Sequence, residues 1–231
     1  MSYGIFIDTT RCVACKGCQV ACKQWNRLPA EQTENVGNLQ NPADLSYTTY
    51  KLVRMQERVL DGIFHWLFFP DQCRHCLTAP CLLWTDNSGA IHQDPATGAV
   101  LYTEKTRNLN TEQIIAVCPY DVPRRGGDGV LAKCNLCNDR LKQGLKPACV
   151  QTCPTGCLNF GRLKDIRTMA FERLERVKQT FPGARLLDAD KVRVIFLTAF
   201  APNLYHEKAS SFDPTLWQTQ KVLYHDPIDS Q

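Results

Sequence analysis

The stretch Cys12-Val-Ala-Cys15-Lys-Gly-Cys18-Gln-Val-Ala-Cys22 decides the fold, because it places four cysteines close together along the chain. Its spacing, C-x2-C-x2-C-x3-C, is the one with which bacterial ferredoxins hold [4Fe–4S] clusters. In that arrangement the fourth cysteine of a run binds the other cluster of a pair. A second run, with which the first exchanges its fourth cysteine, is therefore expected elsewhere in the chain.

The second run is Cys134-x2-Cys137-x11-Cys149-x3-Cys153, and a proline follows its last cysteine. Exchange of the fourth cysteines between the two runs predicts two clusters. The first is expected on Cys12, Cys15, Cys18 and Cys153, and the second on Cys134, Cys137, Cys149 and Cys22.

A second couple of runs lies between these two, and it is incomplete. Four of its cysteines predict a third cluster, on Cys73, Cys76, Cys81 and Cys118. The reciprocal cluster would need cysteines at four positions that hold Thr85, Asn108, Thr111 and Ile114. Because all four ligands of one cluster are absent together, we expect three [4Fe–4S] clusters and one vacated site that side chains now fill.

Twelve of the thirteen cysteines belong to these tetrads, and Cys157 is left over. We expect it to be a small buried residue, since free cysteine is often buried. An odd count in a chain of 231 residues disfavours a disulfide framework. A structural zinc site with cysteine ligands is the stronger alternative. The C-x2-C-x2-C-x3-C run suits a cuboidal cluster better than one tetrahedral ion.

The composition is that of an ordinary globular protein, with 44% hydrophobic and 22% charged residues. A net charge of +4 is too weak to indicate nucleic-acid binding. No apolar run is long enough to predict a membrane span. The first residues lack a charged region followed by a long apolar one, so we expect no signal peptide.

The fold class predicted is α+β, with two pseudo-symmetric ferredoxin-like halves, one inserted in the other, and β-hairpin insertions. The first half comprises residues 1–72 and 130–162, with an inserted hairpin. The second half comprises residues 73–129 and contains the vacated site. Residues 163–231 are expected to form a C-terminal extension of helix and strand, which packs on the core or on a partner subunit.

Local patterns predict the secondary structure of each part. Residues 26–50 are expected to be a loop, and Tyr205, Phe212, Trp217 and Tyr224 suggest that the last thirty residues wrap over the core or a partner. We expect strands at Ile5–Ile7 and Val192–Ala199, hairpins that turn at Asp61-Gly62 and at 94–98, and helices at Gln19–Trp25, Thr111–Val117, Asn135–Leu145 and Leu163–Phe181.

Electron transfer is the chemistry that such clusters support. A [4Fe–4S] cluster with four cysteine ligands has no open iron site for a substrate, and burial and hydrogen bonds to its sulfurs set its potential. No catalytic motif is recognisable, and the glycine-rich segment 125–129 lacks the lysine of a phosphate-binding loop. His75 is expected to be a surface imidazole, although it could tune a cluster. Lys133 could offset cluster charge or be a solvated lysine.

The runs resemble those of the iron–sulfur β subunits of molybdenum and tungsten oxidoreductases of the dimethyl-sulfoxide-reductase family. The resemblance covers about residues 3–162. It is closest to the small subunits of soluble periplasmic formate dehydrogenases of sulfate-reducing bacteria. The segments that carry it are Phe6-Ile-Asp8, Thr10–Cys15, Gly17–Trp25, Leu67–Cys76, Cys118-Pro-Tyr-Asp-x-Pro123 and Cys134–Arg140.

The resemblance implies a heterodimer. A large catalytic α subunit would carry a tungsten or molybdenum bis-pterin, its own [4Fe–4S] cluster and the oxidation of formate or the reduction of CO2. The cluster on Cys12 would lie nearest that subunit, the Cys22 cluster next and the Cys73 cluster last. The vacated site is the one that faces a membrane haem subunit in relatives, so a soluble multihaem cytochrome c is the expected acceptor. Export to the periplasm would depend on the signal of the α subunit.

Other functions remain open at this point. The chain could serve another molybdopterin oxidoreductase, such as one for polysulfide, nitrate or an aldehyde, because the substrate is bound by the other subunit. It could also be a stand-alone multicluster ferredoxin, or the zinc protein considered above.

Overall fold

The structure is a computed structural model, and it describes residues 2–35, 37–85 and 88–209. Its longer helices are α1 (Gly17–Trp25) and α5 (Leu163–Lys178), and its short ones are α2 (Thr111–Ala116), α3 (Asn138–Lys142) and α4 (Ala148–Gln151). The strands are β1 (Tyr3–Asp8), β2 (Leu52–Leu60), β3 (Ile63–Asp71), β4 (Ile91–Gln93), β5 (Val100–Tyr102), β6 (Arg124–Arg125), β7 (Leu131–Ala132), β8 (Leu158–Arg162), β9 (Arg185–Leu187) and β10 (Val194–Thr198). Single 3-10 turns cover Thr9–Arg11, Pro80–Leu82, Glu104–Asn108, Pro202–Leu204 and Glu207–Ala209.

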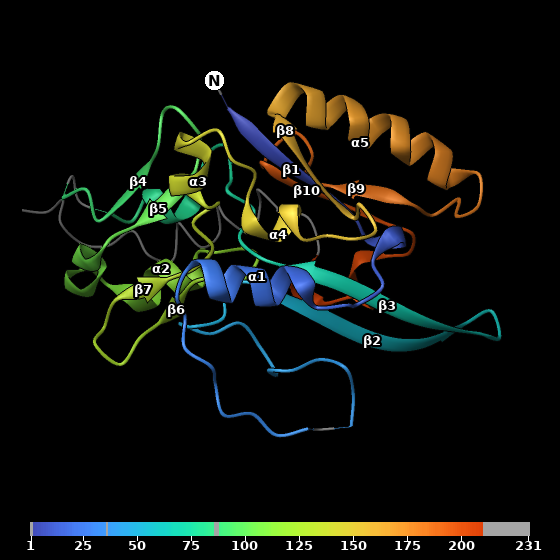
Figure 1. The fold of residues 1–231 in the computed structure, drawn as a ribbon, viewed down its shortest axis with the longest axis horizontal. Coiled ribbons are helices and arrows are strands. Elements are labelled where there is room, and N and C mark those ends of the chain that lie inside the picture. The colour runs from blue at the N-terminus through green and yellow to red at the C-terminus, as the bar shows by residue number, and fades with distance from the viewer. Residues whose placement is uncertain (1, 36, 86–87, 210–231) are drawn as a thin grey trace, which may run out of the picture.

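A four-stranded sheet with the order β8-β1-β10-β9 is the largest sheet of the described residues. Strand β1 pairs with β8 in the antiparallel sense and with β10 in the parallel sense, with Ile5 opposite Val194. The predicted C-terminal segment therefore supplies a strand next to β1. Helix α5 lies along one face of this sheet (Figure 1).

Alternation along β1 divides the core between the two faces of the sheet. Phe6 packs in a cluster with Ile166, Ala170 and other buried residues of α5. Ile5 and Ile7 point to the opposite face, where they join a cluster with residues of β2 and β3 and with several cysteines. Helix α5 thus closes one side of the sheet and the cysteine-rich part of the chain closes the other.

The hairpin of β2 and β3 is paired along nine residues of each strand and turns at Asp61-Gly62, as the sequence predicts. Both turn residues have a positive φ, 50° for Asp61 and 76° for Gly62, which is the conformation that a two-residue hairpin turn requires. The second predicted hairpin is also present, as β4 and β5. Both hairpin predictions are confirmed.

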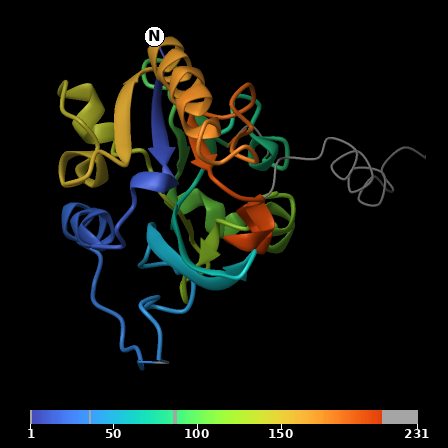
Figure 2. The same ribbon diagram turned by 90° about the vertical axis from the view of Figure 1, so that its right-hand side faces the viewer.

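The other local predictions hold with small changes of length, and one helix is shorter than expected. Helix α3 begins at Asn138 rather than at Asn135, because Leu136 and Cys137 adopt left-handed backbone angles that a helix cannot contain. The described part of residues 26–50 forms a loop that projects from the body on the side away from α5 (Figure 2).

The predicted α+β class is confirmed. Tyr205 is buried, whereas the other aromatic residues of the predicted wrapping segment lie outside the described residues. None of the described helices is long and apolar enough to cross a membrane.

Candidate metal centres

Three C-x2-C loops share one backbone conformation. In each loop the residue before the second cysteine is left-handed: Ala14 (φ 52°), His75 (φ 46°) and Leu136 (φ 58°). The N–H groups of His75 and Leu136 turn back and donate to the Sγ atoms of Cys73 and Cys134, each over 3.4 Å. Hydrogen bonds to sulfur are among the features that set the potential of a bound cluster. The loops therefore present sulfur ligands in one repeated geometry.

The first predicted tetrad comes together near the surface. Cys12, Cys15 and Cys18 lie on the loop after β1 and on the start of α1, and Cys153 follows α4. All four line one cavity of about 290 Å³, part of which is open to solvent. Cys15 is exposed and Cys18 is buried. The fourth cysteine of the second run thus faces three cysteines of the first run.

Cys157 lies beside this cavity and is buried, as predicted, with 1% of its surface exposed. Its thiol is hydrogen-bonded to Cys153 and Cys12. The hydrogen bond from Cys157 lowers the pKa of Cys153 to about 4, although burial opposes this shift. Cys157 is therefore a sulfur neighbour of two predicted ligands.

The second predicted tetrad is buried. Cys22 lies on α1 and Cys149 lies on α4, and these two helices pack against each other. Cys134 and Cys137 precede α3. Burial raises the pKa of Cys22, and the charges of the other three members raise it further. The same burial raises the pKa of Cys134 and Cys149 to about 12 and that of Cys137 to about 11. These four thiols therefore share one apolar environment.

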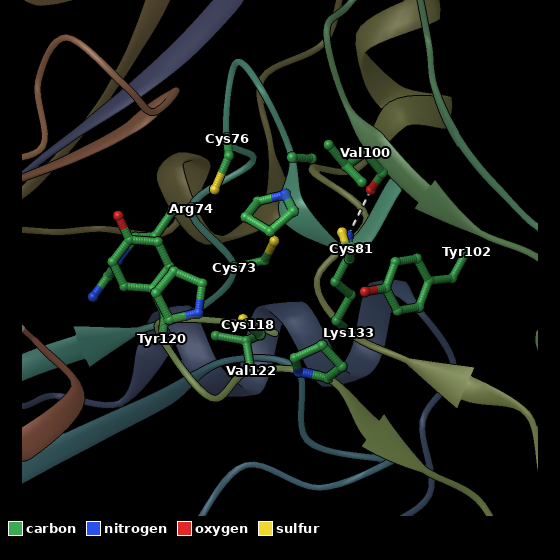
Figure 3. Close-up of a pocket in the computed structure, with 14 residues that line it drawn as sticks. Cys73, Arg74, Cys76, Cys81, Val100, Tyr102, Cys118, Tyr120, Val122 and Lys133 are labelled. Atoms are coloured by element: carbon green, nitrogen blue, oxygen red, sulfur yellow. Dashed lines mark hydrogen bonds between the residues drawn. The ribbon is translucent and has the colours of Figure 1, made fainter. Parts of the chain in front are cut away.

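The third predicted tetrad lines a cavity of about 360 Å³. Its members, Cys73, Cys76, Cys81 and Cys118, direct their sulfur atoms toward a common space (Figure 3). Burial raises the pKa of Cys118 to about 12. Arg74 and Lys133 stand at the edge of the same cavity and bring positive charge to it.

The donor sets fit iron–sulfur clusters. Thiolates are soft ligands that suit iron–sulfur clusters and zinc. Four thiolates around one zinc ion would bring sulfur atoms to about 3.8 Å from one another, as a Zn–S distance of about 2.3 Å requires. In the described residues no group of three or more His, Cys, Asp and Glu side chains is gathered in this way. The four cysteines of the first tetrad line one cavity and those of the third tetrad line another.

The structure corrects the expectation for His75 and decides between the two alternatives for the solvation of Lys133. His75 is not a surface imidazole: it is fully buried, and its Nδ1 accepts a hydrogen bond of 3.1 Å from the backbone N–H of Val100. Lys133 is not solvated either, because only 6% of its surface is exposed. The loop containing His75 and strands β5 and β7 bury both residues by non-local packing, so their sequence neighbours do not reveal it.

Lys51 is a further charged residue of this region that sequence analysis missed. It precedes β2 and is 1% exposed. Its only local signal is the apolar pair Leu52-Val53 that follows it. Its ammonium group donates to the carbonyl oxygen of Pro70 over 3.1 Å and to Oε1 of Gln72 over 2.6 Å.

Two of the four residues at the predicted vacated site have the surroundings expected for them. Ile114 is fully buried, in a cluster with Ile91 and Leu131. Thr85 donates from Oγ1 to the carbonyl oxygen of Leu82 over 3.0 Å. Thr111 is buried and Asn108 is exposed. The prediction of a buried Ile114 and a hydrogen-bonded Thr85 is confirmed.

Comparisons with known proteins agree with this site. The 4Fe-4S dicluster domain matches residues 64–163. Formate dehydrogenase subunit beta of Megalodesulfovibrio gigas is 55% identical over 213 residues, which are 90% of this chain and 99% of the relative. Formate dehydrogenase 2 subunit beta (cytochrome c-553) of Nitratidesulfovibrio vulgaris is 45% identical, over 90% of this chain and 99% of the relative. The formate dehydrogenase-O iron-sulfur subunit of Escherichia coli is 38% identical, over 87% of this chain and 68% of the relative.

The fold and the cysteine groups define an iron–sulfur protein of the 4Fe-4S dicluster class, whose role is electron transfer. Within that class, the chain belongs to the family of formate dehydrogenase β (iron–sulfur) subunits. Members of this family are electron-transfer subunits of an oxidoreductase complex and are not catalytic themselves. A catalytic α subunit is therefore its partner.

Proposed function

We propose that this chain conducts electrons through three [4Fe–4S] clusters in a row. The path runs between the tungsten or molybdenum pterin site of the α subunit, where formate and CO2 interconvert, and a soluble acceptor. The clusters would bind to the three tetrads described above, with Cys22 and Cys153 exchanged between their runs. The observation that supports the proposal is that the four cysteines of the first tetrad line one cavity and those of the third line another.

The order of the three clusters has support from neighbouring cysteines. Cys18 and Cys22 lie on one helix, α1, so the first and second sites are adjacent. The charge of Cys73 raises the pKa of Cys134, after burial, so the second and third sites are also neighbours. The first site is nearest the surface through the exposed Cys15, which suits electron exchange with the α subunit.

The two ferredoxin-like halves have support from the Cys-Pro segments. Asp121 is left-handed (φ 46°), three residues after Cys118, and Gly156 is left-handed (φ 64°), three residues after Cys153. Together with the repeated C-x2-C loops, this similarity favours a first half made of residues 1–72 and 130–162 and a second half made of residues 73–129. We propose that the C-terminal extension from residue 163 packs on this core, since β10 pairs with β1.

The acceptor and the compartment are proposed from the name of one relative and from the resemblance described above. The name of the Nitratidesulfovibrio vulgaris relative includes cytochrome c-553. We propose a c-type cytochrome, such as a multihaem cytochrome c, as the acceptor of this chain, and a periplasmic location reached by export with the α subunit. Rapid mixing of the formate-reduced complex with such a cytochrome measures the transfer directly. A reduction rate no faster than with an unrelated haem protein would contradict this acceptor.

Iron content tests the number of clusters. Three complete tetrads predict about twelve iron atoms per chain, four for each cluster. The measurement is iron and zinc analysis of the complex purified without oxygen, after subtraction of the iron of the α subunit. About sixteen or eight iron atoms, or zinc in place of iron, would contradict the proposal.

The variant Cys22→Ala tests the exchanged ligands. Because Cys22 is placed with Cys134, Cys137 and Cys149, we expect loss of the middle cluster and a retained first cluster. Formate oxidation with a dye that accepts electrons near the α subunit should persist, whereas transfer to a cytochrome should fall much further. Equal loss in both assays, in an assembled complex, would contradict this ligand assignment.

A further inference from the structure

Two buried lysines lie among the cysteine groups, and the hydrogen bonds of both end on neutral oxygens. Lys51 donates to the oxygens of Pro70 and Gln72, as described above. Lys133 donates to the carbonyl oxygens of Val100, over 2.6 Å, and Cys134, over 3.1 Å. A buried ammonium group is costly unless an opposite charge compensates it. Both positions therefore require a negative group close by.

Lys51 lies between the first and second tetrads. It donates to the carbonyl oxygen of Pro70, which lines the cavity of the first tetrad. Val53, two residues further along the chain, packs in one cluster with Cys18 of the first tetrad and Cys149 of the second. A cluster held by four thiolates is negatively charged, so two such clusters would supply the opposite charge that Lys51 lacks.

Lys133 lies between the second and third tetrads. It directly precedes Cys134, and its ammonium group donates to the carbonyl oxygen of that residue. It also lines the cavity of the third tetrad (Figure 3). Its charge acts on the thiol of Cys81. The ring of Tyr102 lies 4.6 Å from its Nζ and holds the ammonium group in this place.

A buried lysine therefore lies between the first and second tetrads, and another lies between the second and third. We propose that Lys51 and Lys133 are positioning residues of the electron path, each of which stabilises the reduced state of the two clusters that flank it. The proposal rests on the three-cluster function proposed above. A positive charge at a short distance in a buried region favours the addition of an electron to either neighbour. The second cluster lies next to both lysines, so the reduced state of that cluster is stabilised most.

The test replaces each lysine with methionine in the whole α–β complex. Lys51→Met should shift the midpoint potentials of the first and second clusters to more negative values and leave the third unchanged. Lys133→Met should shift the second and third clusters and leave the first unchanged. The measurement is a redox titration followed by electron paramagnetic resonance, with the cluster signals assigned by cysteine variants.

Controls separate this effect from a general loss of structure. Lys178→Met removes an exposed lysine from the far end of α5 and should move no potential. Lys51→Gln keeps a hydrogen-bond donor without the charge and should reproduce the shift of Lys51→Met, which provides a second variant if methionine prevents assembly. An iron content of about twelve in each variant shows that the clusters are present.

Unchanged potentials in fully loaded Lys51 and Lys133 variants would overturn the inference, as would equal shifts of all three clusters. These outcomes differ from failure of the proposed function. In that case the unaltered chain itself would lack three clusters, whatever the lysine variants do.

Discussion

Arg193 connects the Cys73–Cys76 loop to the main sheet by hydrogen bonds. Its guanidinium group donates to the carbonyl oxygens of His75 and Cys76, over 3.2 and 3.0 Å. Its Nε donates to Oγ of Ser2 over 3.0 Å. The side chain passes over Gly98, which has a φ of 81° and leaves no space for a Cβ atom. Gly98 thus permits the contact that holds the predicted ligand Cys76 and its neighbour His75 in place.

Gly98→Ala should therefore destabilise the protein by about 1–3 kcal/mol, because the new methyl group clashes with Arg193 and the left-handed backbone disfavours alanine. We expect the third cluster to become the most labile. Thermal unfolding and iron release from the complex measure the two effects. Gly127→Ala is the matched control, since a Cβ atom at Gly127 meets nothing within 4 Å. Equal stability of the two variants would contradict this account.

Cys157→Ala tests whether the thirteenth cysteine is a ligand. Because Cys157 is buried beside Cys12 and Cys153 but outside the tetrads, its removal should leave about twelve iron atoms per chain. We expect stability to fall by about 1 kcal/mol, from the loss of a buried sulfur atom and its hydrogen bond. Iron analysis and thermal unfolding measure both quantities. Loss of about four iron atoms would make Cys157 a ligand instead of Cys153.

At the scale of elements, Glu31 organises the long loop between α1 and β2. Its Oε1 accepts hydrogen bonds from the hydroxyl groups of Ser46 (2.6 Å), Thr48 (2.8 Å) and Thr49, and it pairs with Lys23 over 3.3 Å. Burial alone would raise the pKa of Glu31, but the hydrogen bonds and Lys23 outweigh it and lower the pKa to about 2. The stabilisation is therefore fully present at neutral pH and is lost progressively as the pH falls from about 4.5 to about 2.

Glu31→Gln should loosen this loop at neutral pH, because an amide oxygen is a weaker acceptor and carries no charge for Lys23. We expect a local loss of about 1 kcal/mol, given that hydrogen bonds to charged groups contribute about 1.5–3 kcal/mol and the site is partly exposed. Amide hydrogen exchange over residues 26–50 measures the change. Glu34→Gln, an exposed neighbour in the same loop, should leave the exchange unchanged. Similar exchange in both variants would contradict the role of Glu31.

At the scale of the whole molecule, the cysteine groups are part of the core. Cys18 and Cys149 pack in one cluster with Ile5, Val53 and Phe196, which joins the main sheet to the β2–β3 hairpin. In the described part of the chain, the spaces that clusters would fill therefore interrupt the hydrophobic core. Folding and cluster binding are expected to be coupled, as in other proteins with structural metal sites.

Removal of iron with a chelator under reducing conditions should strongly destabilise the chain. The thiols of each tetrad would lose their bonds to iron, and the cavities of the first and third tetrads would lose the groups that fill them. Circular dichroism during heating measures the change, and reconstitution with iron and sulfide should restore the transition. An iron-free chain that melts like the loaded one would contradict this coupling.

Local sequence signals predicted most elements of the fold. Asp61-Gly62 specifies its hairpin turn because few residue pairs adopt two positive φ angles. The apolar spacing at Ile166, Ala170 and Leu174 specifies the buried side of α5. The predicted start of α3 is too early. Leu136 and Cys137 have a left-handed backbone that belongs to the cysteine loop, and their residue types do not predict this conformation.

The sequence by itself predicted the grouping of the twelve cysteines into three tetrads, because the spacing of ligands along a short loop reflects the size of the group that they bind. It also predicted a vacated site, through four missing cysteines. Only the tertiary structure decided that β10 lies between β1 and β9, and that Lys51, His75 and Lys133 are buried. Those features arise from contacts between distant segments, and the burial of a side chain depends on everything that packs around it rather than on its neighbours in the chain.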